Sequence, residues 1–160
     1  MLIRKLKDFN EIEQIADNLR IENRLIGFTN GCFDIVHAGH ISYLEKAKEL
    51  VDVLILGLNS DDSIKRIKGS SRPINNQNDR AVVLGGLESI DYIVIFEEDT
   101  PMELIKRIKP GILIKGADWK NKGVVGCEFV ESYGGRCEFI EFLENRSTTN
   151  IIEKIADVYC

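Results

Sequence analysis

The sequence predicts an open α/β fold in which helices cover both faces of a parallel sheet. Short apolar segments alternate along the chain with segments of helical periodicity, as expected when strands and crossover helices follow one another. The segment 53–58, VLILGL, has no polar side chain, which is typical of a strand buried on both faces. At 160 residues the chain has the length of one ordinary domain. We therefore expect a single-domain, Rossmann-like doubly wound sheet over residues 1–160.

The first expected element is a helix at 8–19, where Phe9, Ile12, Ile15, Ala16 and Leu19 share one face. It precedes the core, which we expect at about 25–158. Strands are expected at 25–29, 53–58, 92–96, 112–115 and 137–140.

The remaining helices are expected at 39–50, 61–67, 79–87, 100–108 and 148–158. Thr100 is the expected N-cap of the fourth, because Pro101 in the first turn and Glu103 three residues after the cap complete that signature. Residues 68–78 contain glycine, proline and two asparagines and predict a loop.

The composition argues against several classes of protein. A formal net charge of −5 is atypical of a general nucleic-acid binder, which usually has a basic excess. No apolar run reaches the roughly 18 residues of a membrane span, and the charged start does not resemble a signal peptide. Four cysteines (Cys32, Cys127, Cys137 and Cys160) show neither C-x-x-C pairing nor zinc spacing. We expect reduced thiols, no metal site held by the protein, no membrane contact and a cytoplasmic location.

The most informative segment is 30–40, NGCFDIVHAGH, between the first strand and the next helix. It contains the only two histidines, His37 and His40, on either side of Gly39. Backbone N–H groups at a helix start, together with imidazole donors, favour phosphate oxygens. Glycine allows a phosphate to approach the backbone. The alternative is that one histidine caps the helix and the other is solvated.

The known position of ligands in open parallel sheets provides a test of the phosphate-binding hypothesis. Ligands bind beyond the carboxyl ends of the strands. The segments 30–40, 59–68, 116–119 and 144–149 should therefore meet at one edge of the sheet.

A basic stretch follows the second strand, with Lys65, Arg66, Lys68 and Arg72 and no acid between Ser63 and Asn78. In an acidic chain this reversal of charge favours a loop that covers phosphates. A solvated loop is the alternative.

Two further segments have candidate ligand groups. In 116–119, Asp118 is a candidate for a ribose hydroxyl or a base edge, and Trp119 for stacking; the alternative is an ordinary turn with a half-buried tryptophan. In 146–150, RSTTN, Ser147 or Asn150 is expected to cap the last helix. The hydroxyls there also suit a second anion site.

Together the stretches NGCFD, HAGH, NSDDSIKRIKG, SRPIN, the pair Asp79-Arg80, YIVIFEEDTP, KGADW and RSTTNII resemble the cytidylyltransferase-like nucleotidyltransferases that carry the H-x-G-H motif. Within that family they are most similar to the heptose adenylyltransferases. The match keeps one register from about residue 27 to 155. The resemblance implies transfer of AMP from ATP to D-glycero-β-D-manno-heptose 1-phosphate, giving ADP-heptose and pyrophosphate for lipopolysaccharide core synthesis.

The resemblance also implies residue roles. His37, His40 and Lys65 or Lys68 would act on the phosphates as catalytic groups. The nucleotide would be bound by Asn30, Gly31, Cys32, Phe33, Asp34, Gly39, Arg80, Gly116, Asp118, Trp119, Ser147, Thr148 and Thr149.

We expect direct attack of the acceptor phosphate on the α-phosphorus, without a general base, because a phosphate monoester is already anionic near neutral pH. Mg²⁺ would arrive with the nucleotide. The resemblance further implies a separate heptose kinase in the pathway and suggests a homodimer.

Two other functions stay open. Trp119 is similar to the tryptophan of glycerol-3-phosphate cytidylyltransferases, so CTP with glycerol 3-phosphate or another small sugar or polyol phosphate is an alternative. The other is a non-catalytic nucleotide sensor, against which the two histidines and the two lysines argue.

Overall fold

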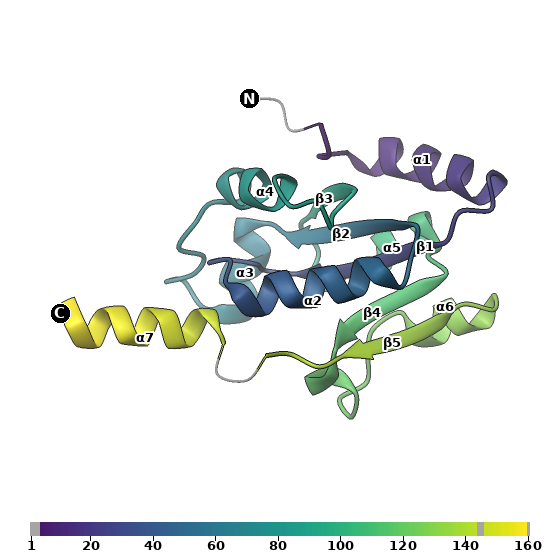
Figure 1. Ribbon diagram of the computed structural model, residues 1–160. Coiled ribbons are helices and arrows are strands. Elements are labelled where there is room, and N and C mark those ends of the chain that lie inside the picture. The colour runs from purple at the N-terminus through teal and green to yellow at the C-terminus, as the bar shows by residue number, and fades with distance from the viewer. Residues whose placement is uncertain (1–3, 144–145, 160) are drawn as a thin grey trace.

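The computed structural model describes residues 4–143 and 146–159. Its strands form one parallel sheet in the order β3-β2-β1-β4-β5 (Figure 1). The strands are β1 (Ile26–Gly31), β2 (Val53–Asn59), β3 (Tyr92–Phe96), β4 (Ile112–Gly116) and β5 (Arg136–Ile140). The predicted fold class is confirmed.

The helices follow the expected order, with two additions. They are α1 (Phe9–Ile21), α2 (Ala38–Glu49), α3 (Asp61–Lys68), α4 (Gln77–Gly85), α5 (Met102–Ile108), α6 (Cys127–Ser132) and α7 (Thr148–Tyr159), with a 3₁₀ turn η1 (Ala117–Trp119). The sequence did not predict α6 or η1. Helix α4 begins two residues earlier than expected because Asn76 caps it, accepting from the N–H groups of Asn78 and Asp79.

The predicted capping of α5 was wrong. The carbonyl of Pro101 accepts the first bond of the helix, from the N–H of Ile105 at 2.9 Å, so Pro101 and not Thr100 is the N-cap. Proline has no side-chain acceptor, and this helix start has no side-chain cap bond.

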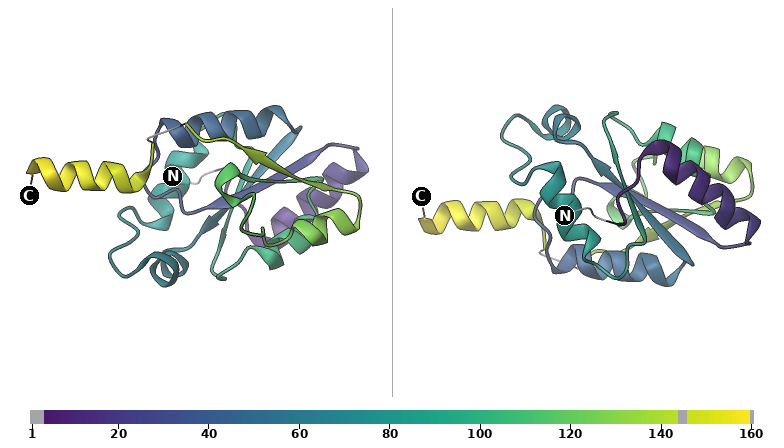
Figure 2. Two further views of the ribbon diagram at one scale, coloured as in Figure 1. Left: turned by 90° about the horizontal axis from the view of Figure 1, so that it is seen from below. Right: turned by 90° about the horizontal axis from the view of Figure 1, so that it is seen from above.

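Helices lie on both faces of the sheet (Figure 2). Apolar side chains fill the space between the helices and the sheet on each face. Leu54, Leu56 and Leu58 of β2 pack with α2 and α4 on one face. Val53 and Ile55 pack with α1 and α5 on the other. Successive side chains of a strand point to opposite faces, so an unbroken apolar strand is what two covered faces require.

The chain reverses its direction of winding at β1. From β1 the strands progress through β2 to β3, and the next crossover brings β4 to the other side of β1. β1 therefore pairs with both β2 and β4. The crossovers on the two sides leave a crevice beyond the carboxyl ends of β1 and β4, which is where such sheets bind ligands.

The two edge strands of the sheet, β3 and β5, are protected in different ways. Residues 5–7 run beside β3, where the N–H of Lys7 donates to the carbonyl of Ile93 at 2.9 Å and the N–H of Ile93 donates to Lys5 at 2.8 Å. At the other edge, β5 is five residues long and carries an ion pair between Arg136 and Glu138, 2.8 Å apart.

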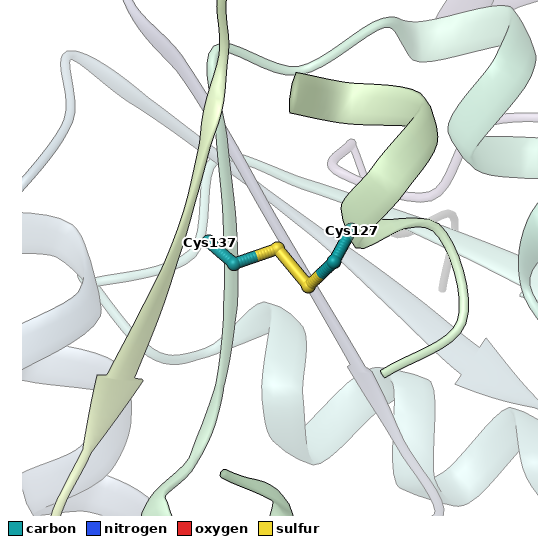
Figure 3. The surroundings of a disulfide bond; sticks show 2 residues. All are labelled: Cys127 and Cys137. Carbon is teal, nitrogen blue, oxygen red and sulfur yellow. A yellow bond between two sulfur atoms is a disulfide. The ribbon is translucent and has the colours of Figure 1, made fainter. Parts of the chain in front are cut away.

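A disulfide joins Cys127 at the start of α6 to Cys137 in β5 (Figure 3). The expectation of reduced thiols was wrong for this pair. The chain turns back between α6 and β5 and brings the two Cα atoms within 5.8 Å, a separation that a disulfide spans. Cys32 is a free thiol, and Cys160 lies outside the described residues.

Helix α7 extends away from the rest of the molecule in every view (Figures 1 and 2). Its side chains include the exposed Ile155, Val158 and Tyr159. No helix within residues 4–143 and 146–159 is long and apolar enough to cross a membrane.

Candidate active site

A cavity of about 160 Å³ opens at the carboxyl ends of β1 and β4. We call it the β1–β4 cavity. It is lined by Asn30, Gly31, Cys32, Phe33, Asp34, His40, Tyr43, Lys68, Arg72, Lys115, Gly116, Trp119, Phe142 and Thr148. The structure thus brings together residues of the four segments that the sequence placed at one edge, although residues 144 and 145 lie outside the described part.

His37 begins α2 as its N-cap. Its Nδ1 accepts a hydrogen bond from the N–H of Gly39 at 3.1 Å. Because Nδ1 is the acceptor, the neutral ring has its proton on Nε2, which can donate to an anion. A side chain at Gly39 would approach the His37 ring to 2.9 Å, so glycine allows this close cap. The capping half of the alternative interpretation is confirmed for His37.

His40 is partly buried rather than freely solvated, which contradicts the other half of that alternative. Its ring stacks on His37 with centroids 3.8 Å apart and lies 5.0 Å from the ring of Phe33. Burial, followed by the nearby His37 and Lys68, lowers the pKa of His40 to about 4. Its Nδ1 is buried and has no hydrogen-bond partner among the described residues. A neutral imidazole with an unused polar atom is prepared for a ligand.

Phe33 holds this arrangement through an unusual backbone. Its φ is +44°, in the left-handed region that a side chain such as phenylalanine rarely adopts, at a cost of about 1–3 kcal/mol. The side chain is buried and lies beside His40. The strained turn immediately after β1 therefore directs an aromatic ring under the imidazole.

Asp34 fastens the basic loop over the cavity. Its carboxylate accepts from Arg72 Nε at 2.6 Å and from the N–H groups of Ile74 and Asn75, each at 2.9 Å. Burial opposes ionisation of Asp34, but the backbone N–H groups and the guanidinium outweigh it and lower its pKa. Asp34 lines the cavity, yet its oxygens are occupied by the loop, so it orients Arg72.

Arg80 lies behind the cavity and does not line it. Its guanidinium is buried and donates to the carbonyls of Cys32 at 2.7 Å, Asn59 at 2.9 Å and Asn75 at 3.0 Å. It also pairs with Asp61 at 2.7 Å. The implied contact of Arg80 with nucleotide is therefore not what the structure shows. Arg80 fixes the carboxyl ends of β1 and β2.

The two predicted lysines have different surroundings. Lys68, at the end of α3, lines the cavity. Lys65 is exposed and pairs with Asp62 at 3.0 Å, away from the cavity. Arg72, which the sequence placed only in the basic stretch, joins Lys68 in the lining.

The opposite wall comes from the ends of β4 and β5. Gly116 lies against Phe142, whose ring would meet a side chain at this position at 1.9 Å. Trp119 and Phe142 are 43% and 44% exposed, so part of each ring is accessible from the cavity mouth. Thr148 donates to the carbonyl of Ile35 at 3.2 Å and ties the start of α7 to the segment after β1.

Several predicted residues do not line the cavity: His37, Gly39, Lys65, Arg80, Asp118, Ser147 and Thr149. Ser147 is the cap of α7, accepting from the N–H of Asn150 at 3.0 Å. The sequence missed Tyr43, Lys115 and Phe142. A strand-terminal lysine in ILIK was the available signal for Lys115, whereas Tyr43 and Phe142 look like ordinary core residues.

The fold and cavity define a class of protein. The model of the cytidylyltransferase-like family matches residues 28–154, so the chain belongs to that family. It is a nucleotidyltransferase by class.

Similar proteins narrow the comparison. The chain is 52% identical to the bifunctional protein HldE of Pelobacter propionicus over 97% of its length, and 57% identical to that of Nitratiruptor sp. over 94%. It spans about a third of the length of these relatives, 32% in each case.

Among solved structures, a lipopolysaccharide core biosynthesis protein of Thermoplasma volcanium is 27% identical, with a TM-score of 0.62 over 77% of this chain and 99% of that one. A pantoate-beta-alanine ligase of Francisella tularensis, 18% identical, has a TM-score of 0.63 over 96% of this chain and 78% of that one. The latter likeness shows the shared fold.

Proposed function

We propose that the chain transfers AMP from ATP to D-glycero-β-D-manno-heptose 1-phosphate, releasing pyrophosphate and forming ADP-heptose for lipopolysaccharide core synthesis. One observation carries the proposal: His40, Lys68, Arg72, Lys115 and Thr148 converge on one cavity at the switch point of the sheet. Identity above 50% to HldE over nearly the whole chain supports the heptose assignment.

The phosphates of the nucleotide would lie against the start of α2. The Nε2–H of His37, the imidazole of His40 and the cations Lys68 and Arg72 are donors there. Because His40 is neutral, it donates without adding a buried charge. Fixed donors aimed at a phosphate whose charge grows during displacement stabilise the transition state more than the ground state.

The adenosine would occupy the β4–β5 side. Gly116 leaves room beside Phe142, and the exposed parts of the Trp119 and Phe142 rings suit a base. Asp118 lies beside Trp119 in the 3₁₀ turn η1, and its carboxylate would accept a hydrogen bond from a ribose hydroxyl. Ser147 and Thr149 support Thr148 at the start of α7.

Mg²⁺ would enter with the nucleotide. Asp34 is the carboxylate among the residues that line the β1–β4 cavity, and its oxygens are bonded to Arg72, Ile74 and Asn75. This donor set fits a cation carried mainly by phosphate oxygens, where Mg²⁺ neutralises phosphate charge.

The wider setting belongs to the same proposal. A heptose kinase would supply the acceptor, and ATP would be drawn from the cytoplasm. The exposed apolar residues Ile155, Val158 and Tyr159 on α7 support a homodimer in which a second copy covers that face. Light scattering at two protein concentrations tests it, with Ile155→Glu/Val158→Glu expected to shift a dimer to monomer.

The direct test is pyrophosphate release with Mg²⁺, heptose 1-phosphate and each of ATP, CTP, GTP, UTP and dTTP at equal concentration. We expect ATP to be preferred by at least about 100-fold in kcat/KM, because unpaired buried groups reject a wrong base. Faster reaction with CTP, or with glycerol 3-phosphate as acceptor, would replace the adenylyl assignment. Tight ATP binding with no pyrophosphate from any acceptor would favour the sensor.

A further inference from the structure

Lys115 is the penultimate residue of β4 and lies where two cavities adjoin. The second cavity, of about 380 Å³, is bounded by the end of α3 and the segment before α5. We call it the α3–α5 cavity. It is lined by Asn30, Gly31, Cys32, Asn59, Ile67, Lys68, Asp99, Thr100, Pro101, Lys115, Trp119, Val124 and Val125. Six of these residues also line the β1–β4 cavity, and Lys115 is one of them.

The strand register explains this position. β4 runs parallel to β1, with Gly27 opposite Ile112 and Phe28 opposite Leu113. Continuing that register places Lys115 beside Asn30, whose carbonyl is 3.5 Å from the Lys115 Nζ. The ammonium therefore lies across the end of the central strand, where the two cavities adjoin.

The interactions of Lys115 leave its charge poorly compensated. Within residues 4–143 and 146–159 it makes no ion pair within 4.0 Å. Its other contact is the face of the Trp119 ring, with Nζ 5.4 Å from the centroid. Burial lowers the pKa of Lys115 to about 8, although Asp118 and Cys32 act in the opposite direction. A half-buried ammonium without a carboxylate is expected where an anion will bind.

Asn30 gives a second and independent sign of a ligand. Its Oδ1 is buried and has no hydrogen-bond partner among the described residues, and Asn30 lines both cavities. Buried acceptors in folded proteins are nearly always satisfied. A hydroxyl-bearing molecule at the junction would satisfy Asn30 while its phosphate neutralises Lys115.

We propose that Lys115 is a catalytic residue that contacts both the phosphate of a sugar phosphate in the α3–α5 cavity and the α-phosphate of a nucleotide in the β1–β4 cavity. This proposal rests on the proposed function for the identity of the transfer. In that step an acceptor phosphate oxygen forms a bond to the α-phosphorus. The bond from the α-phosphorus to the bridging oxygen breaks, and pyrophosphate leaves with the electron pair. No proton needs to move.

A cation at the junction is needed because both reactants are anions. Two phosphates that approach bonding distance repel each other, and a fixed ammonium between them reduces that repulsion at the moment of transfer. Lys68 lines the same two cavities from the end of α3. The reacting phosphates would thus lie between two lysines, of which sequence analysis identified one.

Matched variants test this role. Lys122 is the control, because its Nζ also lies over the Trp119 ring, at 5.7 Å, and Lys122 lines neither cavity. Lys115→Met should lower kcat by about 100-fold or more, change KM for ATP much less, and leave the melting temperature unchanged or higher. Lys115→Arg should retain more turnover than Lys115→Met. Lys122→Met should stay within about twofold of the parent.

A second measurement keeps this proposal separate from the proposed function. Acylation of lysine amines, followed by mass spectrometry, reports occupancy without turnover. Mg-ATP should slow acylation of Lys115, inorganic phosphate should slow it further, and neither should protect Lys122. If neither probe protects Lys115, or if Lys115→Met keeps turnover within tenfold of the parent, the role is wrong. If the parent releases no pyrophosphate with heptose 1-phosphate, the proposed function fails, and the protection result still decides the role of Lys115.

Discussion

The two walls of the β1–β4 cavity are built in different ways. The β1–β2 wall is held by buried polar groups that each make several bonds to the protein: Asp34 in the lining bonds to the basic loop, and Arg80 behind the lining bonds to three carbonyls. Apart from Lys115, the β4–β5 wall presents a glycine and two half-exposed aromatic rings, Trp119 and Phe142.

The two walls differ because binding the phosphates of a nucleotide and recognising its base have different requirements. Phosphates are the same in every nucleotide, and their stabilisation requires donors that are fixed before binding. A base is recognised through a flat apolar face and a few edge contacts, for which aromatic side chains on a less constrained segment are sufficient. Changes in the first wall should therefore affect folding and rate, and changes in the aromatic rings of the second wall should affect affinity and choice of base.

The largest expected effect is on stability. Arg80→Met removes donors from the carbonyls of Cys32, Asn59 and Asn75 and should lower the free energy of unfolding by about 3–5 kcal/mol. Urea unfolding measures it. The control is Arg66→Met, because Arg66 makes an exposed pair with Asp99 and should lose no more than about 1 kcal/mol. Equal losses in the two variants would contradict the structural role of Arg80.

Next is the rate. His40→Ala removes a partly buried, neutral donor and should lower kcat by about 100- to 1,000-fold, or about 3–4 kcal/mol in activation free energy, with ATP affinity changing much less. Stopped-flow or steady-state pyrophosphate release measures it. A variant that stays within tenfold of the parent would remove His40 from the mechanism.

The pH dependence of stability tests the same residue without substrate. The pKa of His40 is about 4 in the folded protein and near 6.5 in an unfolded chain. Between those values the unfolded chain holds a proton that the folded one lacks, so stability falls as pH drops from 6.5 toward 4, by about 3 kcal/mol at pH 4. Burial and Arg146 lower the pKa of His37 as well, which adds loss of the same sign. His40→Ala should flatten this part of the curve, and an unchanged slope would contradict the lowered pKa of His40.

A smaller effect is expected on the second wall. Trp119→Ala should weaken ATP binding by about 1–3 kcal/mol, the usual value of a base stacked on an aromatic ring, while unfolding changes little because the ring is 43% exposed. Isothermal titration measures it. Tyr159→Ala, an exposed aromatic on α7, is the control and should bind ATP as the parent does. If Trp119→Ala lowers the free energy of unfolding but leaves ATP affinity unchanged, the ring has a structural role and does not bind the base.

The smallest effect separates the two lysines of α3. Lys65 is exposed and paired with Asp62, so Lys65→Ala should change stability by no more than about 0.5 kcal/mol and leave turnover near that of the parent. Lys68→Ala should reduce turnover strongly, because Lys68 lines both cavities. If Lys65→Ala and Lys68→Ala lose equal turnover, Lys65 also acts in the active site.

Sequence reasoning succeeded where one physical signal dominated. The apolar strand β2 and the capped start of α2 follow from burial and from helix-end chemistry, and the meeting of the loops at one edge follows from parallel topology. It failed where the direction of a side chain decided the outcome. Arg80 points into the protein and Lys65 points away from the cavity, and neither direction can be read from residue type.

Other failures have equally specific causes. Helix α6 has six residues, too few for helical periodicity to be detected. The disulfide depends on a chain reversal that Cys127 and Cys137 do not signal by their spacing. Lys115 belongs to a strand whose register with β1 became known only from the sheet order.

The structure of the two sheet edges affects the tendency of the protein to aggregate at high concentration. An open strand edge exposes unpaired N–H and C=O groups that can recruit another chain and start aggregation. Residues 5–7 occupy part of the β3 edge, and the short β5 edge carries the charges of Arg136 and Glu138, which discourage strand addition. Deletion of residues 1–7 should therefore increase light scattering on storage before it affects turnover, whereas Arg136→Val/Glu138→Val should have the same consequence from the opposite edge.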